Sequence, residues 1–193
     1  MRYTQIPETA FKEIQLNAGC LCTSFTPSDG TITGIIGAST GGWNFTATPT
    51  FSDWGADIDN CPKNMKELKK LESWEVKMSG TFVTITAAAA KALVGAADIA
   101  SSDNTKIVPR NDVENSDFAD LWWVGDYSDK NGDKNGGFVA IHMLNTLSTG
   151  GFQIQSSDKA KGNFSAEFTA HYSMDNQNEV PFEVYVKAGT EET

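Results

Sequence analysis

Strict alternation of apolar and polar residues is the feature that most constrains this chain. Across residues 43–51 every second side chain is apolar or proline, and the residues between them are one asparagine and three threonines. Residues 74–82 alternate in the same way. Because successive side chains of a strand point to opposite faces, each run predicts a β-strand buried on one face. Pro49 cannot donate to a ladder, so we expect the first strand at an edge or a bulge, and Gly80 predicts a bend.

The C-terminal half predicts further strands at residues 121–127, 164–172 and 182–187. Residues 138–144 are apolar on both faces, which indicates a strand at the centre of a sheet. We expect these strands to form an antiparallel meander, with a turn rich in Asn-Gly chemistry at residues 129–137.

One segment predicts an α-helix. Thr86 stands before an alanine-rich run that reaches Ala97, and threonine is a favourable N-cap while alanine is the best helix former. Its nearly apolar faces predict close packing on a sheet. With 193 residues, of which 39% are hydrophobic, the chain is expected to form a single, mainly antiparallel β domain with a loose tail at residues 188–193.

A long polar connection separates the first two alternating runs, from about residue 55 to residue 71. A hairpin needs only a few residues, so a connection of this length in a compact domain is typical of a functional loop. It contains a short helix-like patch at residues 65–71. Trp54, Ile58 and Leu68 give this arm apolar side chains to bury against a partner.

The charge of the chain is strongly acidic. Its formal net charge is −10, and residues 112–133 contain seven acids and one lysine. This sign disfavours specific binding to a phosphate backbone, but it suits a surface past which DNA must slide.

Compartment signals are few. No charged n-region followed by an apolar stretch opens the chain, and no apolar run has the length of a membrane span, so we expect neither a signal peptide nor a membrane-spanning segment. The three cysteines, Cys20, Cys22 and Cys61, are expected to be reduced thiols in a cytosolic assembly compartment.

The sequence offers weak candidates for catalysis. Residues 37–41 match G-x-S-x-G around Ser39, but a strand is expected after this motif where a nucleophile elbow needs a helix, so we expect a glycine-rich hairpin loop. Glu167 and His171 share one face of a predicted strand and could form an acid–base pair. The chemistry of neither motif is complete, so we expect no enzyme activity.

Metal and cofactor motifs are also incomplete. Residues 131–136 resemble part of a calcium loop, but His142 stands where the bidentate glutamate is required. Zinc-ligand spacings and glycine-rich phosphate loops are missing from the sequence. We therefore expect no metal and no cofactor.

Three stretches carry a resemblance to a known family. They are NSDFADLWWVGDY at residues 115–127, STGGFQI at residues 148–154 and VPFEVYVK at residues 180–187. In pattern and order they resemble the major tail proteins, or tail tube proteins, of siphophages and related prophages. The similarity covers about residues 43–187, and the first 40 residues contribute little.

The resemblance implies an antiparallel β-sandwich or half-barrel with one packed helix. Six such subunits join their inner sheets into a ring, rings stack into a tube, and the genome passes through the lumen without specific binding. It also implies tape-measure, tail-terminator and distal tail proteins as partners, and a location in the virion after assembly in the host cytoplasm. An inter-subunit role for Trp54, Ile58 and Leu68 fits this picture, as do lumen-facing acids among Asp117, Asp120 and Asp126.

Two other classes of function stay open. A β-sandwich binding module of a tail or cell surface, glycan-binding or adhesin-like, would use exposed Trp43, Trp54 or Trp74 as a stacking platform. An enzyme would depend on Ser39 or on the pair Glu167 and His171.

Overall fold

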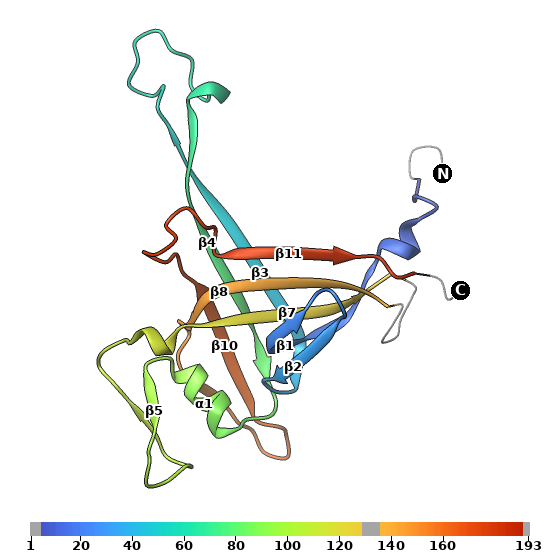
Figure 1. The fold of residues 1–193 in the computed structure, drawn as a ribbon, viewed down its shortest axis with the longest axis vertical. Coiled ribbons are helices and arrows are strands. Elements are labelled where there is room, and N and C mark those ends of the chain that lie inside the picture. Colours follow the sequence, from blue (N-terminus) through green and yellow to red (C-terminus); the bar gives the residue numbers. More distant parts are fainter. Residues whose placement is uncertain (1–4, 129–135, 191–193) are drawn as a thin grey trace.

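The computed structural model of the chain describes residues 5–128 and 136–190, and this part is mainly β, as the alternation predicts (Figure 1). The strands within it are β1 (Gln15–Thr26), β2 (Thr31–Ile35), β3 (Ser39–Asp53), β4 (Lys69–Phe82), β5 (Ala97–Ile99), β6 (Ile107–Pro109), β7 (Ala119–Tyr127), β8 (Gly137–Ser148), β9 (Gln153–Gln155), β10 (Asn163–Ala170) and β11 (Phe182–Lys187). The helical elements are α1 (Ala87–Val94) and three 3-10 turns, η1 (Ala10–Glu13), η2 (Lys66–Leu68) and η3 (Asn115–Asp117).

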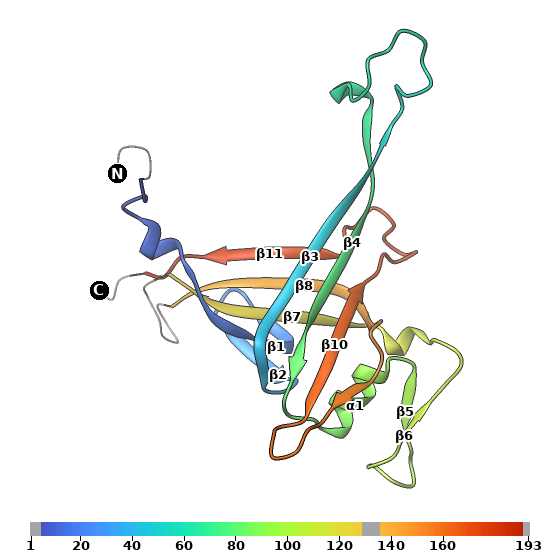
Figure 2. The ribbon, with the colours of Figure 1, turned by 180° about the vertical axis from the view of Figure 1, so that it is seen from behind.

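Nine strands form one antiparallel sheet that folds back over itself. Its order is β2-β1-β7-β8-β10-β4-β3, with β11 added to β8 and β9 added to β10. β8 is shared between two layers, because its first part pairs with β11 while Thr146–Ser148 pair with β10. Figures 1 and 2 show β11, β8 and β7 crossing the direction of β3, β4 and β10. The result is a sandwich-like arrangement.

The main core lies between these two layers. Its buried side chains come from strands of both layers and from α1: Leu21, Val76, Met78, Phe82, Leu93, Leu121, Ile141, Met143, Phe164 and Phe168. The helix begins at the predicted cap, where Thr86 Oγ1 accepts a hydrogen bond from Ala89 N at 3.1 Å. It ends at Val94, earlier than the predicted Ala97, because the cap residue Gly95 has a φ of 84°.

A second buried cluster covers the opposite face of β7 and β8. The β1–β2 hairpin places Phe25 over this face, with ring centroids 5.6 Å from Trp122 and 4.9 Å from Phe138. β8 is therefore buried on both faces over much of its length, and the prediction of a central strand at residues 138–144 is confirmed.

The predicted meander is right for β7, β8 and β10 and wrong for the last strand. β11 pairs with β8 and not with β10. β10 also ends at Ala170, so His171 and Tyr172 lie beyond the strand that the alternation predicts. The predicted turn at residues 129–137 and the end of the predicted tail, residues 191–193, fall largely or wholly outside the described residues.

Gly80 lies beside an irregularity of the sheet. β4 keeps a continuous register with β10 there, but its register with β3 shifts between Thr40, opposite Thr81, and Trp43, opposite Gly80. A Cβ at Gly80 would overlap the Trp43 ring. The glycine thus gives room for a large ring that packs across the strand.

The glycine-rich segment around Ser39 is not a hairpin loop. β2 pairs with β1 and β3 pairs with β4, so the segment joins opposite ends of the sheet. Two backbone bonds hold it in place, from Ile36 N to the oxygen of Leu21 at 3.0 Å and from Val83 N to the oxygen of Ala38 at 2.8 Å. This short connection forces the sheet to curve back on itself.

Candidate assembly surfaces

The β3–β4 hairpin extends beyond the body of the molecule (Figure 1). Its register runs from Ser39 opposite Phe82 to Asp53 opposite Lys69, and the outer half projects as an arm (Figure 1). The predicted arm therefore exists as a local structure, with one correction. Residues 69–71 belong to β4, and the loop proper covers residues 54–65, followed by the short turn η2.

Hydrogen bonds order the tip of the arm. Asp53 accepts one from Gly55 N at 3.0 Å and one from Asn64 N at 2.9 Å. These two donors lower the pKa of the Asp53 carboxyl from its ordinary value. Trp54 N donates to Leu68 O at 3.0 Å, so both limbs of the loop are tied together. The arm is a pre-ordered structure.

The arm exposes large apolar side chains. Trp54 is 63% exposed, Ile58 53% and Phe51 50%. The ammonium groups of Lys70 and Lys69 lie 4.8 Å and 5.1 Å from the ring centroids of Trp54 and Phe51. Two of the three predicted arm residues, Trp54 and Ile58, are therefore displayed to solvent.

Leu68, the third predicted residue, has a different place. It is half-buried, and its methyl group together with Cys61 Sγ packs close to Gly55, where a Cβ would lie 2.9 Å from both. Leu68 supports the shape of the loop from within.

β3 also presents an unpaired edge. From Trp43 to Asp53 its described pairing is with β4 alone, so the backbone groups of the other edge have no strand partner in the described residues. Pro49 lies on this edge strand, as predicted. β11 is a second open edge, where Val184 and Val186 are 52% and 61% exposed. Open edges of this kind are templates for pairing with another chain.

The outward face of β3, β4 and β10 is rich in hydroxyl and amide groups. Cross-strand register places the following side chains on it: Asn44, Thr46, Thr48, Glu75, Lys77, Ser79, Ser165, Glu167 and Thr169. Its one lysine, Lys77, forms an ion pair with Glu75 at 2.5 Å. The face is polar, continuous across three strands, and free of unpaired positive charge among the described residues.

The three predicted lumen acids lie in different surroundings. The Asp117 side chain has no exposed surface and forms an ion pair with Arg110 at 2.5 Å. Asp126 is exposed and accepts a hydrogen bond from Asn17 Nδ2 at 2.6 Å. Asp120 is exposed and lies 3.2 Å from His142 Nε2. Asp120 and Asp126 share the outer face of β7, on the opposite side of the molecule's core from the hydroxyl-rich face.

Asp120 belongs to a polar row that crosses three strands. His142 lies between Asp120 on β7 and Glu183 on β11, with Nδ1 3.3 Å from the Glu183 carboxylate, and stacks on Trp122 at a centroid distance of 4.0 Å. Tyr185 donates to Glu183 at 2.6 Å. This bond, with a smaller contribution from His142, lowers the pKa of Glu183, and it raises the pKa of Tyr185.

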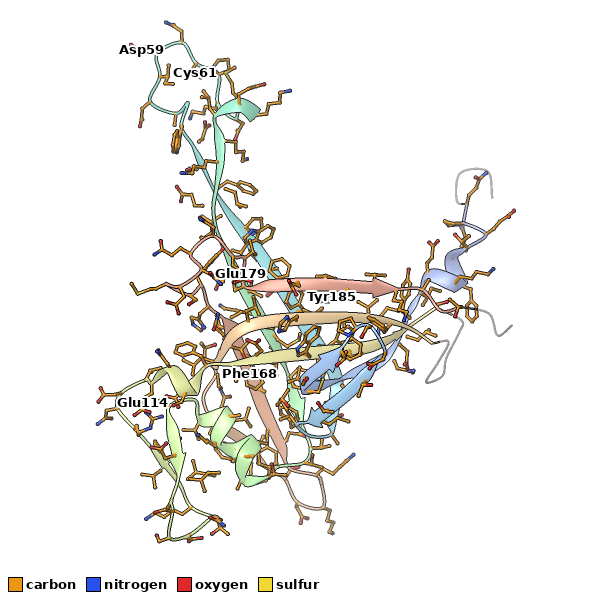
Figure 3. The ribbon with its side chains drawn as sticks, in the orientation of Figure 1. Asp59, Cys61, Glu114, Phe168, Glu179 and Tyr185 are labelled. Atoms are coloured by element: carbon orange, nitrogen blue, oxygen red, sulfur yellow. The ribbon has the colours of Figure 1, made fainter. Side chains whose placement is uncertain are left out.

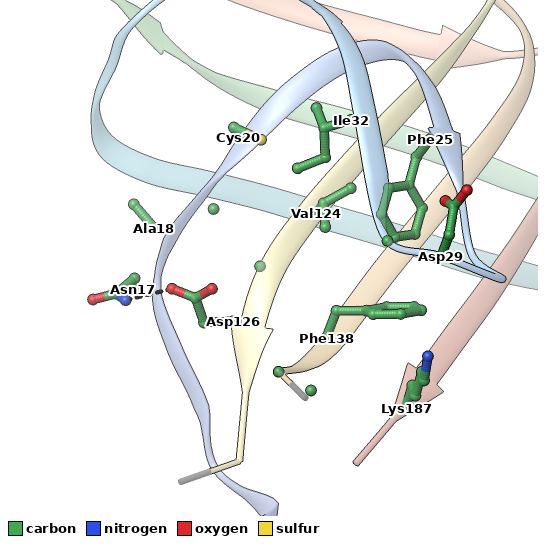
Figure 4. A pocket seen from close by; sticks show the side chains of 15 residues that line it. Asn17, Ala18, Cys20, Phe25, Asp29, Ile32, Val124, Asp126, Phe138 and Lys187 are labelled. Atoms are coloured by element: carbon green, nitrogen blue, oxygen red, sulfur yellow. Dashed lines mark hydrogen bonds between the residues drawn. The ribbon is translucent and has the colours of Figure 1, made fainter. Parts of the chain in front are cut away.

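A cavity of about 480 Å³ lies between the β1–β2 hairpin and the ends of β7 and β8 (Figure 4). Phe25 and Phe138 form apolar parts of its lining, and Asp29 and Lys187 form charged parts. Cys20 also lines it, and the hydrogen bond from Cys22 lowers the pKa of Cys20 to about 7 while raising that of Cys22. We find no convergent set of groups for catalysis among these described residues.

The candidate catalytic residues are not brought together. Glu167 lies on the hydroxyl-rich face, where its carboxylate accepts a hydrogen bond from Thr149 at 3.2 Å. His171 lies beyond β10, with Nδ1 3.1 Å from Asn145 O and its ring against Phe118. Ser39 starts β3 and is not followed by a helix. In residues 5–128 and 136–190, no group of three or more His, Cys, Asp or Glu side chains is placed to hold a metal ion.

The tryptophans proposed as a stacking platform differ in exposure. Trp43 packs edge-on against Phe82 at 4.9 Å, and Trp74 packs against Phe182 at 5.4 Å, so both belong to the border of the core. Trp54 alone of these three stands exposed.

Comparison with known proteins found no family model that matches this chain, and no curated protein similar to it. None of the helices in the described part of the chain is long and apolar enough to cross a membrane.

Proposed function

We propose that this protein is the structural subunit of a bacteriophage tail tube, which assembles as stacked hexameric rings around a genome-conducting channel. The observation that carries the proposal is the β3–β4 hairpin. Along the body of the molecule, the outer edge of β3 has no strand partner among the described residues. The outer half of the hairpin carries exposed Trp54 and Ile58. A monomer would gain nothing from either feature, whereas an assembly would cover both.

Ring closure accounts for the open strands. A sheet that ends in unpaired strands is prone to uncontrolled pairing, and a closed ring of identical subunits removes its edges. We propose that the β3 edge of one subunit pairs with a neighbour in the same ring. The number six comes from the family resemblance of residues 115–127, 148–154 and 180–187.

The hydroxyl-rich face of β3, β4 and β10 is proposed to line the channel. DNA slides past a wall that offers no free cation to its phosphates, and the one lysine of this face is paired with Glu75. Asp120 and Asp126 lie on the other outward face. They would line the channel if the subunit were turned over in the ring.

The same proposal includes the partners and the place of action that the resemblance implies. These are tape-measure, tail-terminator and distal tail proteins, with assembly in the host cytoplasm and function in the virion. DNA would pass through without specific binding, and the subunit would need no cofactor and perform no catalysis.

Negative-stain microscopy of the purified protein tests the function. Rings or tubes with an open bore are expected, and a strict monomer at high concentration in the presence of tail-assembly partners would refute the proposal.

Labelling of assembled tubes then tests which face lines the channel. Thr48→Cys is expected to be shielded from a bulky maleimide and Asp120→Cys to react, and the reverse result would place the acids in the channel.

A shortened hairpin tests the arm. Asp53 and Lys69 are register partners, so an Asn-Gly turn can join them in place of residues 54–68. This variant is expected to be a folded monomer that forms no tubes. Tubes of normal length from this variant would show that the arm plays no part in assembly.

A further inference from the structure

The two ends of the molecule's long axis differ in charge. The arm forms one end, and the β5–β6 hairpin with the chain around η3 lies toward the other (Figure 1). Figure 3 shows Asp59 and Cys61 at the tip of the arm and Glu114 in the opposite region.

The second limb of the arm is basic. Residues 63–70, here called the lysine flank, contain Lys63, Lys66, Lys69 and Lys70 against the single acid Glu67. This is a net charge of +3 in a chain whose net charge is −10. Lys69 and Lys70 stand over Phe51 and Trp54, so charge and exposed aromatic surface coincide. Asp53, Asp57 and Asp59 lie outside the flank, so the arm as a whole, residues 53–71, carries four acids and four lysines and is neutral.

The opposite region is acidic. Residues 97–117, here called the acidic end, contain the acids Asp98, Asp103, Asp112, Glu114 and Asp117 and the bases Lys106 and Arg110, a net charge of −3. Arg110 is occupied internally, because it contacts Asp98 at 2.8 Å, Glu114 at 3.1 Å and Asp117 at 2.5 Å.

Two acids of this end have no such partner. Among the described residues, Asp103 and Asp112 form no ion pair.

Apolar side chains accompany the acids. Val113 is 55% exposed, Val108 40% and Ile99 36%. The acidic end thus combines exposed acids with exposed aliphatic groups. The lysine flank combines exposed bases with exposed aromatic rings.

We propose that the lysine flank of one copy docks on the acidic end of a second copy. The inference rests on the proposed function, since it names the contact that stacks one ring on the next. The lysine flank and the acidic end carry opposite charges, and each also exposes apolar side chains. Electrostatic attraction between such surfaces selects the partner and its orientation. Because the two surfaces lie at opposite ends of one chain, the contact is head-to-tail and can repeat without limit along a tube.

A second copy is the occupant that the charges favour. A chain of net charge −10 repels its own copies unless a local surface of opposite sign meets them, and the flank supplies four of the 15 bases in eight residues. Nucleic acid is the other polyanion that lysines could attract, and the experiment below separates the two.

Charge reversal on each surface tests the docking. The arm variant is Lys66→Glu with Lys70→Glu, and the end variant is Asp103→Lys with Asp112→Lys. The control is Lys159→Glu with Lys161→Glu, which makes the same charge change as the arm variant in the loop before β10. Circular dichroism checks folding, and microscopy with sedimentation measures the fraction of protein in tubes.

Each reversed variant alone is expected to lose tubes by about tenfold or more, while the control keeps them. An equimolar mixture of the two variants is expected to form tubes again, because each arm then meets an end of opposite sign. Higher salt should weaken wild-type tubes.

Three results would overturn the docking. They are normal tubes from the arm variant, a mixture that stays unassembled although both variants are folded, and loss of binding to a DNA duplex in the arm variant without any change in tubes. All three presuppose wild-type tubes. Failure of the wild type to form rings or tubes would refute the proposed function itself.

Discussion

The inner and outer halves of the β3–β4 hairpin are both antiparallel ladders, separated by a register shift between Thr50 and Phe51, and they differ in what covers them. In the inner half, Val76 and Met78 are 0% and 1% exposed, because the crossing layer of β1, β7 and β8 lies over them. In the outer half, Phe51 and Leu71 are 50% and 42% exposed. Pairing of β3 with β4 resumes beyond the register shift between Thr50 and Phe51, so both halves are paired and the difference in exposure follows from what covers them.

This difference separates two uses of apolar residues. Inside the body they are buried within one chain and stabilise its fold. On the arm they remain exposed in the monomer, so they can contribute free energy only when another surface covers them. Substitutions in the inner half should therefore lower the stability of the monomer, and substitutions in the outer half should weaken assembly.

The largest contrast is expected between two phenylalanines of the hairpin. Phe82→Ala removes a ring that is 1% exposed and packs against Trp43, so the free energy of unfolding should fall by about 3–5 kcal/mol. Phe51→Ala on the arm should lower it by less than about 1 kcal/mol. Urea denaturation of the monomer measures both, and equal losses would show that the arm is part of the core.

A smaller loss is expected at Gly80, within the inner half. Gly80→Ala would place a Cβ against the Trp43 ring, and overpacking of this kind costs about 1–3 kcal/mol. Gly162→Ala is the matched control, because a Cβ there meets nothing within 4 Å. If both variants have the stability of the wild type, the contact between Gly80 and Trp43 is not tight in solution.

Order within the arm should depend on Asp53. Asp53→Asn keeps the shape of the side chain but loses the charge that attracts the Gly55 and Asn64 amides. Amide exchange at these two positions should accelerate by about three- to tenfold, with no change in the body. Asp57→Asn in the same loop is the control. Exchange that accelerates throughout the molecule would contradict a local role.

The smallest effect is expected from pH, in the row of Asp120, His142 and Glu183. The pKa of Glu183 is lowered, so its contribution to stability is complete above its ordinary value of 4.5 and is lost as pH falls through the lowered value. The pKa of Tyr185 is raised, so its contribution is complete below 10 and is lost at higher pH.

Glu183→Gln tests this row. Both groups are solvent-accessible, so the effect should be small. When the melting temperature is plotted against pH, its fall on the acid side (the acid limb) should be only about 1–2 °C smaller in this variant than in the wild type. Tyr185→Phe should flatten the alkaline limb. An unchanged acid limb in Glu183→Gln would show that this hydrogen bond is not maintained in solution.

Local pattern was enough to predict β3, β4, β7, β8, β10, β11 and the arm. It did not predict β1, β5, β6 or β9, and it did not predict which strands lie side by side. Alternation marks β3, β4, β10 and β11 because burial on one face acts on each strand separately. Pro49 predicts the edge position of β3 because the missing N–H is a local property. The placement of β11 beside β8 depends on segments far apart in the sequence, and no local pattern contains it.

The candidate surfaces divide in the same way. The length and composition of residues 55–71 predict an arm, and Trp54 and Ile58 are exposed there, but the half-buried position of Leu68 follows from the folding of the loop over Gly55. The acids of residues 112–133 are visible as charge. That Asp117 has Arg110 as its partner depends on how the chain folds between these two residues, which charge counting does not reveal.

By itself the sequence determined the mainly β class, the single capped helix, the position of the arm and the acidic balance, since each depends on residue type and short-range spacing. Tertiary structure alone decided the order of strands, the closure of the sheet through residues 36–38 and the faces on which polar rows gather. The physical reason is that a strand's buried face is set by its own period of two. Its partners are chosen by the packing of the whole chain.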